Sequence, residues 1–126
     1  MISVLRRLAV SVIAFAVVAC SPSTPSGTVN RFFHLVEAEK YNAAFALFTS
    51  QSRAAFPAEK AKEILAEQSR KMKAGGGLKS VVLSNETITG ETATVTAVTT
   101  MGNGKTSSEN YNLAREHGKW LIAIQK

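Results

Sequence analysis

Few residues in this sequence have side chains suited to acid–base, nucleophilic or metal chemistry. The chain has no aspartate, a single cysteine, Cys20, and two histidines, His34 and His117. His34 falls off the apolar stripe of a predicted helix and His117 falls in a predicted turn, and neither has a partner at the spacing of a metal site or catalytic triad. No zinc, phosphate-loop or nucleophile-elbow motif occurs. We therefore expect no metal, no cofactor and no catalysis.

Three polar residues fall on faces that the hydrophobic pattern assigns to the core. Gln68 lies in the inward stripe of a predicted helix, and Glu109 and Tyr111 share the strand parity of Leu113. A buried polar group must find a partner or line a wet cavity. Gln68, Glu109 and Tyr111 are therefore our candidate ligand-binding residues. In the alternative interpretation, Gln68 bonds a backbone group and Tyr111 packs with its hydroxyl at the rim of the core.

The single cysteine follows an apolar run at the start of the chain. Arg6 and Arg7 precede twelve apolar or small residues, 8–19, which are too few for the ~20 residues that span a bilayer. This pattern is typical of an export signal over residues 1–19. The next segment, 20–27, is rich in serine and proline and predicts a short flexible tether.

The end of the apolar run, Val17-Val18-Ala19-Cys20, resembles the lipobox of bacterial lipoproteins. The resemblance implies that the Cys20 thiol carries a diacylglycerol, and that the chain is cut before Cys20 and acylated at its new amino group. Several acyl chains, at ~0.8 kcal/mol per buried methylene, hold a protein permanently on a membrane. Ser21, in place of an aspartate, implies the outer membrane of a two-membrane bacterium, on its periplasmic side. The alternative is an ordinary secretory site that leaves a free thiol.

The chain is moderately basic. The formal net charge is +6, and without Arg6 and Arg7 it is +4, from 13 basic and 9 acidic residues. Outside the cytoplasm the matching negative charge would belong to lipid headgroups or envelope polymers, and we expect no nucleic acid partner. The alternative is a solvated helix end whose cations oppose the helix dipole. The basic excess concentrates around a glycine run, at Arg70, Lys71, Lys73 and Lys79.

The hydrophobic period changes from helical to alternating halfway along the chain. Helices are predicted over residues 28–40, 41–52 and 57–73, and strands over 78–88, 92–101, 106–115 and 120–125. The third helix should bury Ala61, Ile64, Leu65, Gln68 and Met72, and the last strand Trp120, Ile122 and Ile124. On the second strand Thr92, Thr94 and Thr96 should face solvent. This order predicts an α+β fold with three N-terminal helices packed on a four-stranded antiparallel sheet.

Three stretches, "FFHLVEAEKYNAAFALFT", "AGGGLKSV" and "REHGKWLIAI", carry a second resemblance. Together with the late Gly118, Trp120 and Ile122, they resemble small bacterial lipoprotein domains of unknown function in the nuclear-transport-factor-2-like (NTF2-like), or cystatin-like, superfamily. The resemblance implies a curved sheet that wraps a helix into a cone, whose open end often forms a pocket. Some members are enzymes and many only bind, so the fold alone does not settle the function.

These observations predict a signal peptide (1–19), a lipidated cysteine with its tether (20–27) and an α+β domain (28–126). We expect a lipid-anchored cell-envelope protein that binds a partner protein or a small apolar ligand and catalyses nothing. The alternative is a minor enzyme of the steroid-isomerase type that uses a pocket glutamate such as Glu109 as its base. In the alternative an open cavity of a few hundred Å³ would surround that carboxylate.

Overall fold

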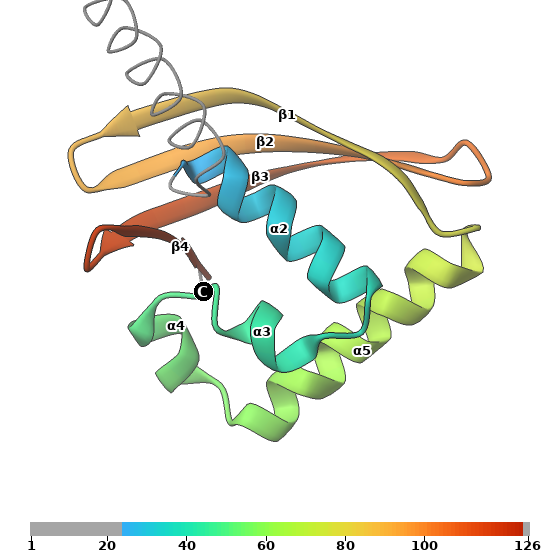
Figure 1. The fold of residues 1–126 in the computed structure, drawn as a ribbon, viewed down its shortest axis with the longest axis horizontal. Helices are drawn as coiled ribbons and strands as arrows, with labels where there is room; N and C mark the ends of the chain where they lie inside the picture. The colour runs from blue at the N-terminus through green and yellow to red at the C-terminus, as the bar shows by residue number, and fades with distance from the viewer. Residues whose placement is uncertain (1–23, 125–126) are drawn as a thin grey trace, which may run out of the picture.

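The computed structural model describes residues 24–124 of the chain. Within them four helices precede a four-stranded antiparallel sheet whose strands follow one another in the order β1-β2-β3-β4 (Figure 1). The helices are α2 (Pro25–Glu37), α3 (Tyr41–Phe45), α4 (Ser50–Ala55) and α5 (Ala58–Ala74), and the strands are β1 (Leu78–Thr89), β2 (Thr92–Met101), β3 (Thr106–Glu116) and β4 (Lys119–Ala123). The α+β class and the antiparallel meander predicted from the sequence are confirmed.

Helix α2 begins three residues earlier than the hydrophobic pattern predicts. The hydroxyl oxygen of Thr24 accepts a hydrogen bond from the Gly27 N–H at 3.0 Å, and Pro25 occupies the first turn, where its missing N–H costs nothing. Residues 25–27, expected in the tether, are therefore helical. The predicted apolar stripe is confirmed, because Val29, Phe32, Phe33 and Val36 are all buried.

The second predicted helix, 41–52, is divided into α3 and α4. Between them Phe48 forms a parallel bridge with Ile122 of β4. The Ile122 N–H donates to the Leu47 carbonyl at 2.8 Å, and the Thr49 N–H donates to the Ile122 carbonyl at 2.9 Å. Thr49 then caps α4, since its hydroxyl accepts from the Ser52 N–H at 3.2 Å. The domain thus has four helices in its described part, where three were expected.

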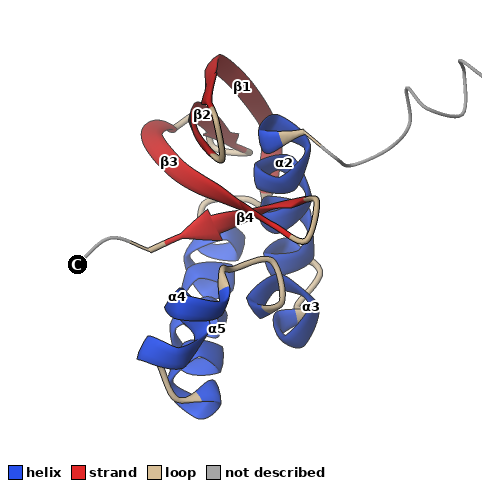
Figure 2. Ribbon diagram, turned by 90° about the vertical axis from the view of Figure 1, so that its left-hand side faces the viewer, coloured by secondary structure: helices blue, strands red, loops and turns tan. Residues whose placement is uncertain are grey.

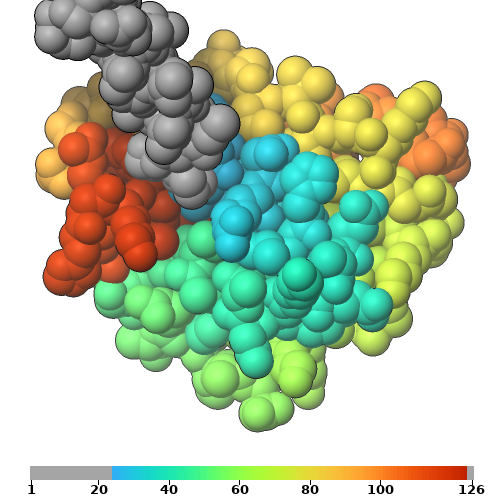
Figure 3. All heavy atoms as spheres, viewed as in Figure 1, coloured from blue at the N-terminus to red at the C-terminus, as the bar shows by residue number. Residues whose placement is uncertain are grey.

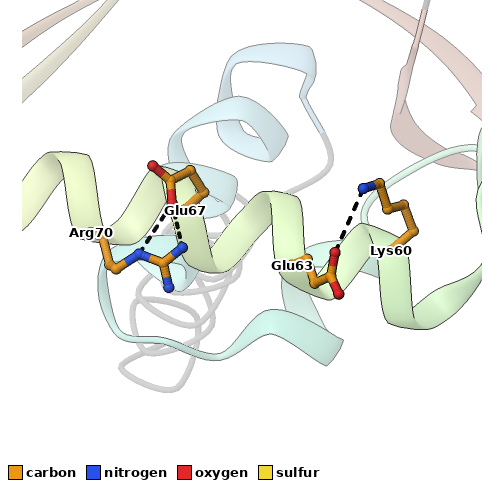
Figure 4. A network of polar contacts seen from close by, with 4 residues as sticks. All are labelled: Lys60, Glu63, Glu67 and Arg70. Carbon is orange, nitrogen blue, oxygen red and sulfur yellow. Dashed lines mark hydrogen bonds and ion pairs between the residues drawn. The ribbon is translucent and has the colours of Figure 1, made fainter.

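Helix α5 buries a stripe slightly rotated from the predicted one. Ala61, Leu65 and Met72 are buried as expected, but Ser69 takes the central buried position and Gln68 is half-buried. Ile64, predicted in the core, is 48% exposed. The opposite face carries ion pairs, including Lys60 Nζ with Glu63 Oε2 at 3.6 Å and the Arg70–Glu67 pair, as Figure 4 shows. Such exposed pairs contribute little stability.

The sheet presents one apolar and one polar face, as the alternation of β2 predicts. Ala93, Val95 and Ala97 are buried, whereas Thr92 and Thr94 are exposed. Val95 pairs with Tyr111 of β3, and Leu113 of β3 pairs with Ile122 of β4. The long strands are strongly curved, and all the helices lie on the concave side (Figure 2). On β4, Trp120 and Ile122 are buried as predicted, but Ile124 lies beyond the strand end and is 40% exposed, so its prediction as core is wrong.

A glycine-rich junction joins the end of α5 to the turn between β2 and β3. The Gly102 N–H donates to the Gly77 carbonyl at 2.8 Å, and the Asn103 N–H donates to the Gly75 carbonyl at 2.9 Å. A Cβ atom on Gly102 would lie 2.4 Å from the Gly76 carbonyl oxygen, so only glycine fits. Residues 75–77 (yellow-green) and 102–105 (orange) lie side by side in the space-filling view (Figure 3).

The helices pack at two levels above the sheet. Helix α2 packs on β1, β2 and β4, and α5 packs chiefly on α2 and α3 (Figure 1). Next to the glycine-rich junction, the Glu37 carboxylate of α2 accepts a hydrogen bond from the Leu78 N–H at 2.7 Å, and this bond positions the first residue of β1. Because α5 rests on other helices, a groove remains between it and the facing part of β3. No helix of residues 24–124 is long and apolar enough to cross a bilayer.

Candidate functional site

Three cavities that share Gln68 run along the space between α5 and β3. Their volumes are about 330, 420 and 660 Å³, and all are open to solvent. Glu109 lines the first and the third cavity, and Tyr111 lines the second. The structure thus brings Gln68, Glu109 and Tyr111 together, as their positions in the sequence predict. We name this region the α5–β3 groove.

The Tyr111 hydroxyl and the Glu109 carboxylate form a polar pair on the inner face of β3. The hydroxyl donates to Glu109 Oε2 at 2.8 Å, and the tyrosine ring packs edge-on against Phe33 at 5.8 Å between centroids. Burial raises the pKa of the Tyr111 hydroxyl, and the hydrogen bond to Glu109 raises it further. Tyr111 is therefore a hydrogen-bond donor at any physiological pH, and Glu109 is held in place as an exposed acceptor.

The 330 Å³ cavity has an apolar floor and a charged rim. Its floor consists of side chains from α2, α5 and β2, namely Phe33, Met72, Ala97 and Met101. Thr99, Thr106 and Ser107 also line the cavity. The rim carries Lys71 from α5 and Lys105 from the β2–β3 turn, as well as Glu109. The arrangement combines apolar contact with both signs of charge.

The predicted basic stretch is largely neutralised where it leaves α5. Arg70 binds Glu67, and its Nε lies 3.1 Å from Glu67 Oε2. Lys73 Nζ lies 2.8 Å from Glu39 Oε2, and this hydrogen bond raises the pKa of Lys73. Lys79 is exposed on β1, and Lys71 lines the groove. The ion pairs favour the interpretation of Arg70 and Lys73 as a solvated helix end.

The remaining candidates lie away from the groove. His34 is exposed on α2, and His117 sits in the β3–β4 turn with a φ of 52°. Among residues 24–124 no cluster of three or more histidine, cysteine, aspartate or glutamate side chains could hold a metal ion. Cys20 lies outside the described residues. Ile64 and Ile124, expected in the core, instead line a small apolar depression of about 190 Å³.

Sequence reasoning missed the groove residues around the β2–β3 turn. Ser107 has the same strand parity as Glu109 and pairs with the buried Thr99, so alternation alone could have placed both on the inner face. Lys105 gives no such signal. It reaches the groove because the glycine junction fixes the turn against the end of α5.

Comparisons with known proteins show the fold. No family model matches the chain, and no curated protein matches it. A crystal structure from Campylobacter jejuni, of a protein provisionally named an NTF2-like transpeptidase, matches with a TM-score of 0.71 and 22% identity over 82% of this chain and 100% of that one. The solution structure of a SEC-C motif containing protein from Rhodopseudomonas palustris matches with a TM-score of 0.60 and 12% identity over 82% and 78% of the two chains. The described α+β domain therefore has the NTF2-like fold.

Proposed function

We propose that this chain is a lipid-anchored cell-envelope protein whose NTF2-like domain binds a partner protein or a small apolar ligand in the α5–β3 groove. The convergence of Gln68, Glu109 and Tyr111 on open cavities beside an apolar floor carries the binding part of this proposal. Ligand sites are commonly concave and apolar with a few converging polar groups.

The anchor part of the proposal rests on Cys20 and its place directly after the apolar run. Four Cα–Cα steps separate Cys20 from Thr24, so a lipid on Cys20 would lie within ~14 Å of the domain. The membrane is then the first partner, with the outer membrane as its site in a two-membrane host. This domain would carry its groove close to that surface.

The anchor is tested by detergent-phase partitioning of the full chain made in bacteria. We expect the wild type in the detergent phase and the Cys20→Ser variant in the aqueous phase. The mass of the N-terminal peptide should show acyl chains on residue 20. An unmodified cysteine at the mature N-terminus would support the ordinary secretory site and contradict the anchor.

The groove is tested by photocrosslinking in living cells. A photoreactive residue is placed at position 68 in the groove, and a matched control at position 94, where Thr94 is exposed on the opposite face of the sheet. We expect adducts from position 68 only, or a small ligand that co-purifies and is seen in native mass spectra. Equal adducts from both positions would contradict a specific site.

A second candidate function is favoured by one observation: the Glu109 carboxylate lines a cavity and accepts a hydrogen bond from a tyrosine hydroxyl at 2.8 Å. An isomerase of the steroid type would use Glu109 as its base and Tyr111 to orient it. Carboxylate bases in enzymes act from sites that exclude water, whereas Glu109 is exposed. Turnover of an unsaturated ketosteroid that disappears in Glu109→Gln would favour this candidate over simple binding.

A further inference from the structure

The charges on the rim of the 330 Å³ cavity are separated along its length. Lys105 lies at the β2–β3 turn, which the glycine junction holds against the end of α5. Lys71 lies on the last turns of α5, where it lines this cavity and also, together with Glu109, the 660 Å³ cavity. Glu109 lies four residues beyond Lys105 on β3, or ~13 Å at the rise of a strand. The Lys105 charge therefore lies beside the glycine junction, the Glu109 charge lies farther along β3, and Lys71 faces both from α5.

These charges are available to a ligand. Among residues 24–124 neither Lys71 nor Lys105 has a carboxylate within ion-pair distance, in contrast to Lys73 and Arg70 nearby. Glu109 receives the Tyr111 hydroxyl on Oε2, and a carboxylate has two oxygens with several acceptor positions.

The wall between the charged ends suits a small apolar body with hydrogen-bonding groups. Phe33, Met72 and Ala97 are buried and form the floor. Thr99 is only 6% exposed and lies in the wall beside its strand partner Ser107. Both hydroxyls can donate and accept, which matches peptide groups better than a plain hydrocarbon.

The cavity is large enough for a small occupant. It is open to solvent, so its volume of about 330 Å³ sets no upper limit. This volume equals the space of roughly eleven water molecules at ~30 Å³ each and can hold a dipeptide of two alanines. Its extended length, ~3.5 Å per residue, is shorter than the separation of Lys105 and Glu109 along β3, and the flexible lysine side chains can close the difference.

We infer that the α5–β3 groove binds a short peptide of small apolar residues with both termini free. The peptide carboxylate lies between Lys71 and Lys105, its side chains lie on Phe33 and Met72, and its ammonium group meets Glu109. This inference rests on the proposed function and names the ligand class of the same groove.

The test uses alanyl-alanine as the probe and amide chemical shifts of the complete mature protein as the readout. We expect shifts at Met72, Thr99 and Ser107. Acetylation of the peptide amino group and amidation of its carboxyl group should each weaken binding about fivefold, the range of a partly exposed ion pair. Blocked peptides that bind as well as the free one would overturn the inference, as would a lack of shifts in the groove.

Variants assign each peptide end to its partner. Glu109→Gln should weaken binding of the free dipeptide about fivefold and leave binding of the acetylated dipeptide unchanged. The double variant with Lys71→Gln and Lys105→Gln should weaken binding of the free dipeptide about fivefold and leave binding of the amidated dipeptide unchanged. Lys119→Gln, exposed on β4, is the matched control and should change nothing. An equal loss of dipeptide binding in Lys119→Gln would show that the effect comes from the net charge of the protein and would overturn the inference. Crosslinking at position 68 is independent of these results, so it separates failure of the ligand class from failure of the groove.

Discussion

Tyr111 and Glu109 lie two residues apart on the same face of β3, with the Tyr111 hydroxyl 2.8 Å from Glu109 Oε2. The raised pKa of Tyr111 makes the folded state hold a proton that the unfolded chain loses above its ordinary pKa of 10.0. Above pH 10 the folded state therefore binds more protons than the unfolded chain. The free energy of unfolding falls as the pH rises above this value, by at most ~1.4 kcal/mol per pH unit.

Tyr111→Phe should remove this dependence. Urea unfolding at about pH 9 and pH 11 should show a larger loss of unfolding free energy in the wild type than in the variant. Lysines titrate in both proteins and cancel in the comparison. Equal losses of unfolding free energy in the two proteins would contradict the placement of the Tyr111 hydroxyl in a hydrogen bond to Glu109. At neutral pH the variant should lose about 1 kcal/mol with the hydrogen bond.

Glu116 gives the opposite pH dependence. Its carboxylate accepts from the Ser50 hydroxyl at 2.6 Å and from the Ser50 N–H at 3.2 Å, and these bonds lower the pKa of Glu116. A lowered folded pKa adds stability above the unfolded pKa of 4.5, and that stability is lost as the pH falls through the folded value. When the pH is lowered from neutral to acidic, the melting temperature of Glu116→Gln should therefore fall less than that of the wild type. A parallel fall in both would be the contrary result.

Gly102 should tolerate no side chain. A Cβ atom there would lie 2.4 Å from the Gly76 carbonyl oxygen, and backbone cannot yield cheaply. Gly102→Ala should cost about 3 kcal/mol of unfolding free energy. Gly90→Ala is the matched control, because Gly90 has a φ of +62° but no atom within 4 Å of an added Cβ. It should cost only about 1 kcal/mol for the left-handed backbone. Equal costs in urea unfolding would argue against the close junction.

Ser69 is a buried polar group that the fold does not use. It is 1% exposed, and its hydroxyl has no hydrogen-bond partner among the described residues. Ser69→Ala should be neutral or stabilise the protein by about 1 kcal/mol. Thr28→Val is the comparison, since Thr28 Oγ1 donates to the Trp120 carbonyl at 2.8 Å in the core, and it should cost about 2 kcal/mol. A destabilised Ser69→Ala would reveal a partner for its hydroxyl.

The second strand could be predicted from its period alone because it buries one face, and the turn residues on either side of the third strand set the bounds of that strand. The second was expected over 92–101 and is Thr92–Met101, and the third was expected over 106–115 and is Thr106–Glu116. The division between α3 and α4 could not be predicted in this way. It depends on the bridge between Phe48 and Ile122, two residues that lie far apart in the sequence. Local helix propensity does not register such a contact and favoured one continuous helix.

The candidate site was predicted in part for the same reason. Glu109 and Tyr111 follow from strand parity with Leu113, and parity survives any change in the helices. Gln68 lies at the edge of the buried stripe of α5. A rotation of the helix by one residue decides which side chain enters the core, and in the structure Ser69 is the buried residue while Gln68 faces the groove. The cationic end with Lys105 needed the glycine junction, which no local pattern reveals.

The start of α2 is fastened twice to the sheet, by Thr28 Oγ1 on the Trp120 carbonyl and by the Ser26 N–H on Glu86 Oε1 at 2.9 Å. These two bonds reach opposite edge strands, β4 and β1. A mechanical load applied at Thr24 would thus be shared across the full width of the sheet instead of peeling one strand away. In the proposed lipid-anchored state, a pull on the N-terminus would therefore be resisted by both edges of the sheet.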